Sequence, residues 1–525
     1  MSSQTGQTAM TQSTAQTGLT SDTEPGTQTG PGPQAEPSPQ TEPGTQARTG
    51  TQSGSRTQAE PSPQTEPGAK PAAAPGEQTR SGTRVLAGEL LAHVGQRVTI
   101  AGWLHRKRQL KSVTFLVIRD RTGLAQVVLA GQDAISAAAG LTEETVLQVT
   151  GLVKASRQAP GGAEIAGPAG SGGPKLTVLS GQTAPPPFDL YRPAIAATLP
   201  TILDHAPTTL RHPLLRSGFE IAAASAAGFR TALDERSFTE IFTPKIVESA
   251  TESGANVFGI DYFGRPAYLA QSPQFYKQAM VGVFERVYEV APAFRAEPHD
   301  TARHLAQFTS LDAELALFGE HGIGDHRDVM AVLRDVIAAM VTAVAERAGP
   351  AAELLHVVLP VVPEPIPQLH FVDAQELIAR SAGWDPTGEP DLSPADERWL
   401  CEWAVREHGS EFLFVTGYPA VAKPFYTHPD PARPGYTNGF DLLFRGLELV
   451  TGGQRLHRHE DYLAALASRG EDPAPYAGYL QIFSHGMPPH GGFAIGLERW
   501  TARLTGAANV RQVTMFPRDI HRLSP

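Results

Sequence analysis

An abrupt change of composition near residue 83 limits where a folded core can form. Residues 1–83 are rich in Gln, Thr, Gly, Pro, Ser and Glu, and they carry almost no large apolar side chains. The segment QAEPSPQTEPG occurs twice, at Gln34–Gly44 and at Gln58–Gly68. Such a segment cannot bury enough apolar surface to offset the entropy lost on ordering. We therefore predict a disordered tail over 1–83, which catalysis should not need, and a folded part that begins near residue 84.

The formal net charge of -11 argues against a nucleic-acid partner, but the charge is unevenly distributed. Between Arg84 and Gly131 eight basic residues stand against only two acidic ones, Glu89 and Asp120, which gives a local net charge of +6. The basic residues are Arg84, Arg97, Arg106, Lys107, Arg108, Lys111, Arg119 and Arg121. Clustered positive charge attracts phosphate backbones whatever the sum over the whole chain. A solvated charged face is the alternative that charge alone leaves open.

Length and cysteine content narrow the class of protein further. A chain of 525 residues predicts two or three domains. Cys401 is the only cysteine, which excludes an intramolecular disulfide and a cysteine-rich zinc site. No apolar stretch is long enough to cross a bilayer, and the N-terminus lacks the basic start and apolar run of a secretory signal. We expect a cytoplasmic enzyme with no membrane partner.

The region 84–183 reads as a small β-barrel. Five short runs rich in β-branched residues predict strands, at Val98–Leu104, Val113–Arg119, Ala125–Leu129, Thr145–Val153 and Lys175–Leu179. Five strands in about a hundred residues, with basic residues between the first two, favour an OB-fold. A proline-rich stretch over 184–213 then predicts a hinge between domains.

The region 214–525 alternates irregularly between helix and strand patterns, which favours an α+β domain with an antiparallel sheet. Two stretches predict helices, Leu214–Asp234 and His326–Gly349. Others predict strands, at Glu240–Pro244, Ala267–Leu269, Val287–Ala291, Ser310–Leu317, Phe412–Thr416 and Phe440–Val450. The chain contains neither GxxxxGK[ST] nor GxGxxG, so a nucleotide would not be held by a P-loop or a Rossmann turn.

Three segments in this region resemble the signature motifs of class II aminoacyl-tRNA synthetases. Phe238–Pro244 resembles the first motif, a strand that ends in proline at a dimer interface. Val287–Glu314, which contains Phe294-Arg-Ala-Glu297, resembles the second, and Gly491–Gly506, which contains Glu498-Arg499, resembles the third. Each match is short, but the three occur in the family's order and at about its spacing.

The resemblance implies an ATP site. Activation of an amino acid requires its carboxylate to attack the α-phosphate of ATP, and arginines with a metal ion can stabilise the developing charge. Arg295 and Arg499 are the implied catalytic residues, and Phe308 would cover the adenine. The implied ATP-binding set is Arg295, Glu297, Arg303, His304, Phe308, Glu448 and Arg499. Glu448 and Thr451 would supply oxygen ligands to Mg²⁺, the implied cofactor.

The amino-acid pocket resembles that of aspartyl enzymes, in particular the archaeal type. Gln271–Gln278, with the sequence QSPQFYKQ, matches a segment of that group, and Arg455 matches the arginine that binds the side-chain carboxylate. A guanidinium assisted by a lysine is a good chemical solution for a short carboxylate. The implied aspartate-binding residues are Glu252, Ser272, Gln274, Lys277, Asp312 and Arg455.

The barrel has matching positions as well. Phe115 and Gln126 resemble the family's anticodon readers, a stacking ring and an amide, and Arg119 is grouped with them. The surface residue His105 and the loop residue Pro160 stand where enzymes that accept both tRNA(Asp) and tRNA(Asn) differ from strict ones, and they match the relaxed pattern. A relaxed enzyme would imply an amidotransferase partner that converts Asp-tRNA(Asn) to Asn-tRNA(Asn).

The sequence thus predicts an aspartate–tRNA ligase that uses ATP and L-aspartate and that the family implies to be a homodimer. Two other interpretations stay open. One is an asparaginyl-tRNA synthetase, or a tRNA-independent relative that makes an aminoacyl adenylate. The other is a catalytically silent nucleic-acid-binding paralogue, against which the intact residues Arg295, Glu297, Glu448 and Arg499 argue.

Overall fold

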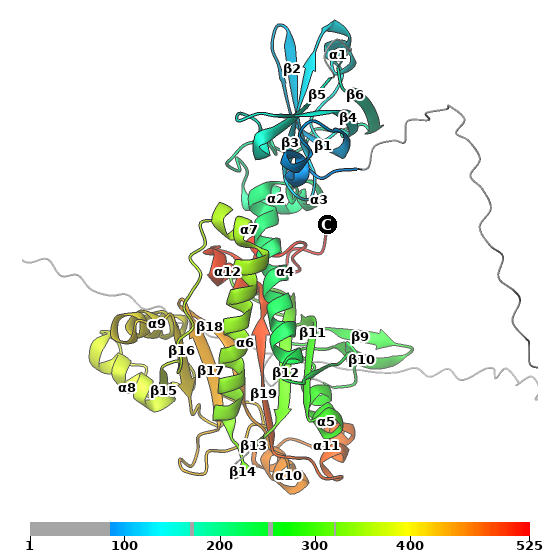
Figure 1. The fold of residues 1–525 in the computed structure, drawn as a ribbon. Coiled ribbons are helices and arrows are strands. Elements are labelled where there is room, and N and C mark those ends of the chain that lie inside the picture. Colours follow the sequence, from blue (N-terminus) through cyan, green and yellow to red (C-terminus); the bar gives the residue numbers. More distant parts are fainter. Residues whose placement is uncertain (1–83, 168–172, 250–255, 320–321) are drawn as a thin grey trace, which may run out of the picture. The chain divides into compact units, whose positions relative to one another are not determined.

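The computed structural model describes residues 84–167, 173–249, 256–319 and 322–525 (Figure 1). The tail predicted over 1–83 lies outside these ranges. Two folded parts are present: a small β-barrel, and a larger domain built on an eight-stranded sheet. This confirms the predicted fold class, an OB-fold barrel with an α+β domain. The boundaries predicted at 183 and 213 remain predictions.

The barrel closes through five strands. They follow the order β1 (Arg97–Gln109), β2 (Val113–Arg119), β3 (Leu124–Ala130), β5 (Ala163–Ala166) and β4 (Val146–Ala155), and β4 pairs back onto β1. Alternate residues of β2 and β3 point inward, so that Leu116, Ile118 and Val127 are fully buried. Helix α1 (Gln132–Ala137) follows β3.

One strand of the barrel was missed by the sequence prediction. The predicted fifth strand, Lys175–Leu179, is β6 (Lys175–Ser180), which pairs only with β4 and lies outside the closed ring. The strand that closes the ring is β5, which has only four residues. Its buried residues, Ala163, Ile165 and Ala166, give too short a pattern to be recognised in the sequence.

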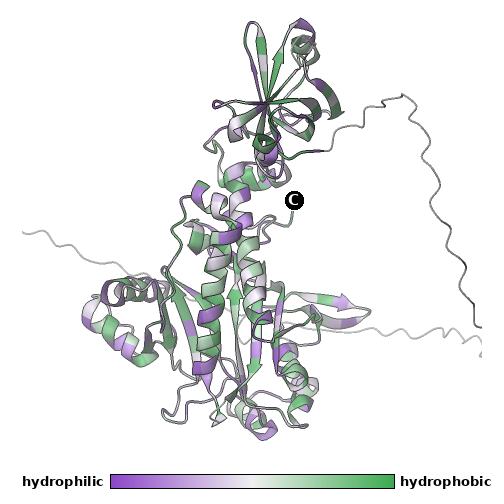
Figure 2. Ribbon diagram, in the orientation of Figure 1, coloured by the Kyte–Doolittle hydropathy of each residue, from purple (hydrophilic) through white to green (hydrophobic). Residues whose placement is uncertain are grey.

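The large sheet has the strand order β15-β16-β17-β18-β19-β12-β11-β7. The six central strands pair antiparallel, and only the two outermost pairs, β15 with β16 and β11 with β7, are parallel. The strands are β7 (Thr239–Glu240), β11 (Arg286–Phe294), β12 (Gln307–Ala316), β15 (Gln368–His370), β16 (Phe412–Thr416), β17 (Gly439–Phe444), β18 (Leu447–Gln454) and β19 (His490–Gly496). Figure 2 shows hydrophobic residues concentrated along these strands.

Two long helices, α4 (Pro213–Asp234) and α6 (His326–Arg347), lie side by side across one face of the sheet (Figure 1). A Cβ at Gly228 would lie 2.7–2.8 Å from the backbone and side chains of α6, so only glycine permits this close approach. Helix α12 (Leu497–Thr505) packs against α4, and Trp500 at its centre is fully buried. This layer leaves the opposite face of the sheet available for a site.

The remaining described elements flank the sheet, pack beside α4 and α6, or belong to the barrel. Helix α5 (Gln274–Phe284) packs on β11 and β12, and α8 (Phe371–Ser381) and α9 (Pro394–His408) pack near β16. A three-stranded sheet contains β8 (Ile246–Val247), β9 (Gly259–Tyr262) and β10 (Arg265–Leu269), and β13 (Phe318–Gly319) pairs with β14 (Gly322–Ile323). Further helices are α2 (Leu199–Asp204), α3 (Ala206–Thr209), α7 (Gly349–Leu354), α10 (His459–Ser468) and α11 (Ala477–Phe483). The described ranges also contain four short 3-10 helices: η1 (Ala87–His93), η2 (Pro160–Gly162), η3 (Ala474–Tyr476) and η4 (Val510–Val513).

Two expectations for this domain need correction. The strand predicted at Phe440–Val450 is a hairpin, β17 and β18, because Arg445 and Gly446 both have positive φ and make a tight turn. The strand predicted at Glu240–Pro244 is reduced to β7, because the chain leaves the sheet before Pro244. The predicted hinge contains α2 and α3, each with a proline in its first turn, where a missing N–H costs nothing.

Candidate active site

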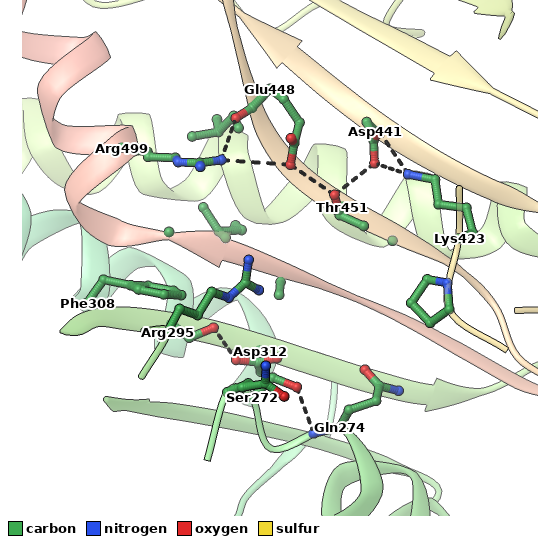
Figure 3. Close-up of a pocket in the computed structure, with 18 of the residues that line it drawn as sticks. Ser272, Gln274, Arg295, Phe308, Asp312, Lys423, Asp441, Glu448, Thr451 and Arg499 are labelled. Carbon is green, nitrogen blue, oxygen red and sulfur yellow. Dashed lines mark hydrogen bonds and ion pairs between the residues drawn. The ribbon is translucent and has the colours of Figure 1, made fainter. Parts of the chain in front are cut away.

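The strongest candidate site is a cavity of about 330 Å³ on the sheet face opposite α4 and α6 (Figure 3). Strands β12, β18 and β19 form its floor, and the first turns of α5 and α12 contribute walls. The cavity is lined by every residue predicted for ATP, aspartate or magnesium except Glu252, which lies outside the described residues. These are Ser272, Gln274, Lys277, Arg295, Glu297, Arg303, His304, Phe308, Asp312, Glu448, Thr451, Arg455 and Arg499.

Arg295 and Phe308 face each other near the base of the β11–β12 hairpin. The Arg295 guanidinium carbon lies 5.5 Å from the centre of the Phe308 ring, within cation–π distance. Its Nε is buried and has no hydrogen-bond acceptor among the residues that the structure describes. A buried donor of this kind is normally satisfied, so the arrangement suits an anionic acceptor on a bound ligand. Figure 3 shows both side chains on the cavity wall.

A chain of polar contacts crosses the opposite wall. Arg499 donates to the Glu448 carbonyl oxygen at 3.3 Å, and its Nη1 lies 3.8 Å from the Glu448 carboxylate. The Thr451 hydroxyl lies 3.0 Å from that carboxylate and 2.8 Å from the Asp441 carboxylate. Asp441 in turn accepts two hydrogen bonds from Lys423, at 2.8 and 2.9 Å. Two carboxylates bridged by the Thr451 hydroxyl are therefore flanked by a cation at each end of this wall.

The electrostatics of this wall keep Glu448 ionised. Burial raises the pKa of its carboxyl, but Arg499 and Lys423 outweigh burial and hold the pKa below its usual value. Burial raises the pKa of Asp441, although Lys423 opposes that rise. Burial likewise raises the pKa of Glu397, which accepts the Glu448 backbone N–H at 2.9 Å and lies 3.5 Å from Arg303.

The oxygens of Glu448 and Thr451 fit one particular mode of magnesium binding. Over the described part of the chain, no group of three or more His, Cys, Asp or Glu side chains could hold a metal ion by itself. Magnesium is commonly bound by one or two carboxylates, while substrate phosphates and water complete its shell. One carboxylate and one hydroxyl beside a cavity that also carries arginines match that mode rather than an all-protein cage.

The far end of the cavity holds four buried charges. The Lys277 amino group lies 3.0 Å from Asp312 and 3.3 Å from Glu314, and Arg455 donates to Glu314 at 2.9 and 3.4 Å. Ser310 donates a short hydrogen bond to Asp312. Lys277, Asp312 and Glu314 are at most 1% exposed, and Arg455 is 5% exposed. Burial raises the pKa of Glu314, but Arg455 and Lys277 outweigh it and hold that pKa below its usual value.

Several residues of this site were not predicted from the sequence. Glu314 lies two residues after Asp312 on β12 and therefore on the same face of the strand. This spacing within the second motif was a signal from which Glu314 could have been predicted. Lys423, Asp441 and Glu397 reach the wall from separate segments, and no local pattern marked them. Glu498 was read only as part of a motif, yet its carboxylate accepts the Thr309 N–H with both oxygens at 3.0 Å.

The barrel carries a second candidate surface. Phe115 and Gln126 lie on the outward face of adjacent strands, because their neighbours Leu116 and Val127 point into the core. The Arg108 guanidinium lies 4.9 Å from the Phe115 ring centre. The Gln126 amide donates to Glu164 at 2.8 Å. Phe115 is therefore not a core residue, which removes the main objection to a stacking role.

Arg119 and His105 lie elsewhere in the barrel. Arg119 is 6% exposed and donates two hydrogen bonds to Glu144, both at 2.9 Å, so a contact with a base would require this ion pair to open. The expectation of a surface histidine is wrong, because His105 is 7% exposed and contacts Arg119 at 3.1 Å. Burial and Arg119 lower its pKa to about 4. Pro160 is half-buried at the start of η2.

Comparison with known families gives two matches. Residues 200–520 match the model of tRNA synthetases class II (D, K and N). Residues 98–169 match the model of the OB-fold nucleic acid binding domain. No helix in the described ranges combines the length and the apolar character needed to cross a membrane.

Individual relatives match over most of their length. The chain is 45% identical over 442 residues to the aspartate–tRNA(Asp/Asn) ligase of Thermus thermophilus, which covers 84% of this chain and 100% of that protein. It is 43% identical over 447 residues to the enzyme of the same name from Deinococcus radiodurans, with 84% and 99% covered. Among solved structures, asparaginyl-tRNA synthetase from Pyrococcus horikoshii with asparaginyl-adenylate has a TM-score of 0.77 at 31% identity, with 84% of this chain and 100% of that chain covered.

Proposed function

The chain belongs to the class II tRNA synthetases of the D, K and N group, and on that premise we propose that it is an aspartate–tRNA ligase. It would join L-aspartate to the α-phosphate of ATP with release of pyrophosphate, and would then transfer the aspartyl group from this adenylate to the 3′ end of tRNA with release of AMP. The observation that carries the proposal is one cavity in which Arg295, Arg499 and Arg455 all take part. Two arginines stand beside the proposed triphosphate site, and the third stands at the buried end.

The buried end suits a small dicarboxylic acid. Arg455 and Lys277 supply two positive groups in a water-poor environment, and a carboxylate gains more from them than a neutral amide does. Asp312 is the anion available to an α-ammonium group, and Gln274 and Ser272 add neutral polar atoms to the same wall. A side-chain carboxylate of aspartate, rather than the amide of asparagine, is the better electrostatic match.

The open end suits ATP. Arg295 would contact the α-phosphate, where charge develops as the aspartate carboxylate attacks. Arg303 and His304 would meet the γ-phosphate, and Arg499 would hold that phosphate while its planar guanidinium lies against the adenine. Phe308 would cover the other face of the ring. A bound magnesium ion, held by Glu448 and Thr451, would supply charge neutralisation at the phosphates.

For the tRNA we propose the relaxed specificity printed in the names of the two relatives, aspartate–tRNA(Asp/Asn) ligase. Phe115 would stack on a base of the anticodon, and Gln126 would bond its edge. The proposal includes His105 and Pro160 as the two residues that match the relaxed pattern. Because an aspartyl group on tRNA(Asn) is not the product that translation needs, an amidotransferase is the implied partner.

We also propose a cytoplasmic homodimer. The first-motif segment that would lie at the interface exposes an apolar ring, Phe242, which is 87% exposed. Two further apolar side chains shortly after the second motif are also exposed, Phe318 at 59% and Ile323 at 74%. A second copy of the chain would remove such apolar surface from water.

One pair of assays tests the proposal. ATP–pyrophosphate exchange should depend on L-aspartate and proceed far more slowly with L-asparagine, since Arg455 and Lys277 favour a carboxylate. Charging assays should then attach aspartate to both tRNA(Asp) and tRNA(Asn) transcripts. Exchange that prefers asparagine would favour the asparaginyl alternative, for which the similar Pyrococcus horikoshii structure is the specific support. Exchange without any charging would favour the tRNA-independent alternative, and neither reaction would indicate a silent paralogue.

A further inference from the structure

The C-terminal segment holds the loop that carries Arg303 and His304, and one side chain, Arg511, makes two of the contacts. Arg511, in η4, is 6% exposed. Its Nη2 lies 2.8 Å from the Asp300 carboxylate, and its Nη1 donates to the Thr301 carbonyl oxygen at 2.9 Å. Its Nε lies 2.6 Å from the Asp519 carboxylate. One guanidinium thus ties the 295–306 loop to the last residues of the described chain.

Backbone contacts continue the same attachment. The Val510 N–H donates to the Ala302 carbonyl oxygen at 2.9 Å, and the Ala306 N–H donates to the Arg518 carbonyl oxygen at 2.7 Å. Leu305 packs with Val510 in a small buried cluster. Residues 510–519 therefore hold the loop at its middle, 300–302, and at its C-terminal end, 305–306. Among the described residues, Arg511 supplies the only charged side chain of that segment that contacts the middle of the loop.

The attachment continues from Arg511 to the cavity. Thr301, whose carbonyl oxygen Arg511 binds, places its hydroxyl 2.7 Å from His304 Nδ1 and accepts the Arg303 N–H at 3.3 Å. Arg303 and His304 both line the cavity. Burial and the nearby Arg499 lower the pKa of His304, so this ring stays neutral and its hydrogen bond to Thr301 fixes its orientation.

We propose that Arg511 is a positioning residue for ATP: it fixes Asp300 and Thr301 so that Arg303 and His304 are held at the phosphate end of the cavity. The inference rests on the proposed function of that cavity. Arg511 touches no substrate and acts through the loop alone. Arginine is required because three acceptors in different directions use its planar fork, which a single ammonium group cannot match.

The test compares three variants in ATP–pyrophosphate exchange. Arg511→Gln should raise the KM for ATP by about tenfold, the effect of one lost charge-assisted hydrogen bond, and should leave the KM for aspartate within about twofold of wild type. Asp300→Asn weakens only the loop side of the attachment, because the contacts of Arg511 with Asp519 and Thr301 remain, and it should raise the KM for ATP by a smaller factor. The matched control is Arg522→Gln. Arg522 joins the same C-terminal segment to Asp204 of α2 at 2.7 Å without touching the loop, so both KM values should stay unchanged.

A second measurement separates positioning from general loss of structure. Amide hydrogen exchange of peptides that cover 296–306, without ATP, should be faster in Arg511→Gln than in wild type and unchanged in Arg522→Gln. The inference is overturned if the KM for ATP stays within twofold in both Arg511→Gln and Asp300→Asn, or if the two KM values rise together. Should Arg511→Gln fail to fold, Asp300→Asn decides. If wild type shows no aspartate-dependent exchange, the proposed function fails, whereas ATP binding by calorimetry still tests Arg511.

Discussion

At the scale of single residues, Glu314 is the anion that pairs with Lys277 and Arg455 behind the buried end of the cavity. It is fully buried, and two cations, Arg455 and Lys277, hold its charge there. Removal of one partner of a buried ion pair leaves an uncompensated charge, which typically costs about 3–5 kcal/mol. Arg455 therefore has two separable duties, one toward the proposed substrate and one toward the stability of the fold.

A double substitution separates these duties. Arg455→Ala should lower the free energy of unfolding by about 3 kcal/mol or more and should abolish aspartate-dependent exchange. Arg455→Ala combined with Glu314→Gln removes the stranded charge, so it should recover most of the stability but none of the activity. Thermal unfolding and pyrophosphate exchange measure the two effects. A double variant as unstable as the single one would show that Glu314 is not the reason for the loss.

His490 is a second residue whose state is fixed by its partners. Its Nδ1 lies 2.8 Å from the Pro488 carbonyl oxygen, which can only accept, so this nitrogen carries the proton. Its Nε2 lies 2.8 Å from the Gln278 amide nitrogen, which can only donate, so this nitrogen is the acceptor. The ring is therefore neutral, and burial lowers its pKa to about 4.

This lowered pKa predicts a pH dependence of stability. Between pH 6.5 and pH 4 the unfolded chain protonates this histidine and the folded chain does not, so acid favours unfolding and stability falls as the pH falls. Across this pH range the lowered pKa of His490 reduces the free energy of unfolding by roughly 3 kcal/mol in total. His490→Gln, which retains a donor and an acceptor, should flatten the decline of unfolding free energy between pH 7 and pH 4. The control His521→Gln alters a side chain that is 72% exposed and should not change the slope.

At the scale of elements, the β17–β18 hairpin presents Glu448 and Thr451 to the cavity. Its turn contains Arg445 at φ 46° and Gly446 at φ 81°. An L side chain at Gly446 would adopt a strained backbone conformation, and its Cβ would lie 3.1 Å from Arg398. The register of the whole strand β18, and with it the height of Glu448 on the cavity wall, depends on this turn.

Two glycine substitutions with opposite expected effects on stability test the turn. Gly446→Ala should destabilise the protein by about 1 kcal/mol or more, because alanine there needs a positive φ. Gly478→Ala lies at an exposed position of helix α11, where nothing is within 4 Å of a Cβ, and should stabilise the protein by about 0.5–1 kcal/mol. Differential scanning calorimetry of both variants gives the signs. Equal and favourable shifts would mean that Gly446 is not conformationally required.

Elements with a long regular pattern were predictable from the sequence, and short or irregular ones were not. Helix α4 and strand β16 were anticipated to within one residue, because α4 has a helical apolar pattern and β16 is a continuous apolar run. The four-residue strand β5 and the turn at Arg445 were missed, since neither contains the Asn-Gly or Asp-Gly signal that marks a hairpin in sequence.

The residues of the cavity likewise divide into those that the sequence could predict and those that it could not. Residues inside recognisable motifs, such as Arg295 and Arg499, were placed in advance. Lys423 and Asp441 were not, because a pair joined across the fold is set by tertiary structure and leaves no local spacing to read. His105 shows the converse error, since a histidine beside basic residues looked exposed, although it lies at a bulge of β1 and is buried against Arg119.

At the scale of the whole molecule, the proposed chemistry and the proposed reading of tRNA use different surfaces. The cavity residues all come from 271–510, whereas Phe115 and Gln126 belong to the barrel strands β2 and β3. Adenylate formation needs only the groups around the cavity. Charging needs in addition that the anticodon bind, and the basic stretch 84–131 would support that step through phosphate contacts that weaken as salt rises.

Replacement of the stacking ring should therefore separate the two activities. Base stacking on an aromatic side chain contributes about 1–3 kcal/mol, so Phe115→Ala should lower kcat/KM for tRNA charging by about tenfold or more. Pyrophosphate exchange should stay within about twofold of wild type. The matched control is Val128→Ala, which removes an apolar side chain at the position directly opposite Phe115 in the strand register and offers no ring to a base.

The comparison of both rates across the two variants decides what Phe115 does. If it stacks on a base, only Phe115→Ala loses charging, and the loss appears in the KM for tRNA. If the ring matters only for the packing of the barrel surface, Val128→Ala should show a similar loss, because both residues lie on the same outward face. If exchange falls together with charging in Phe115→Ala, the barrel would influence the cavity directly, and the assignment of separate duties to the two surfaces would be wrong.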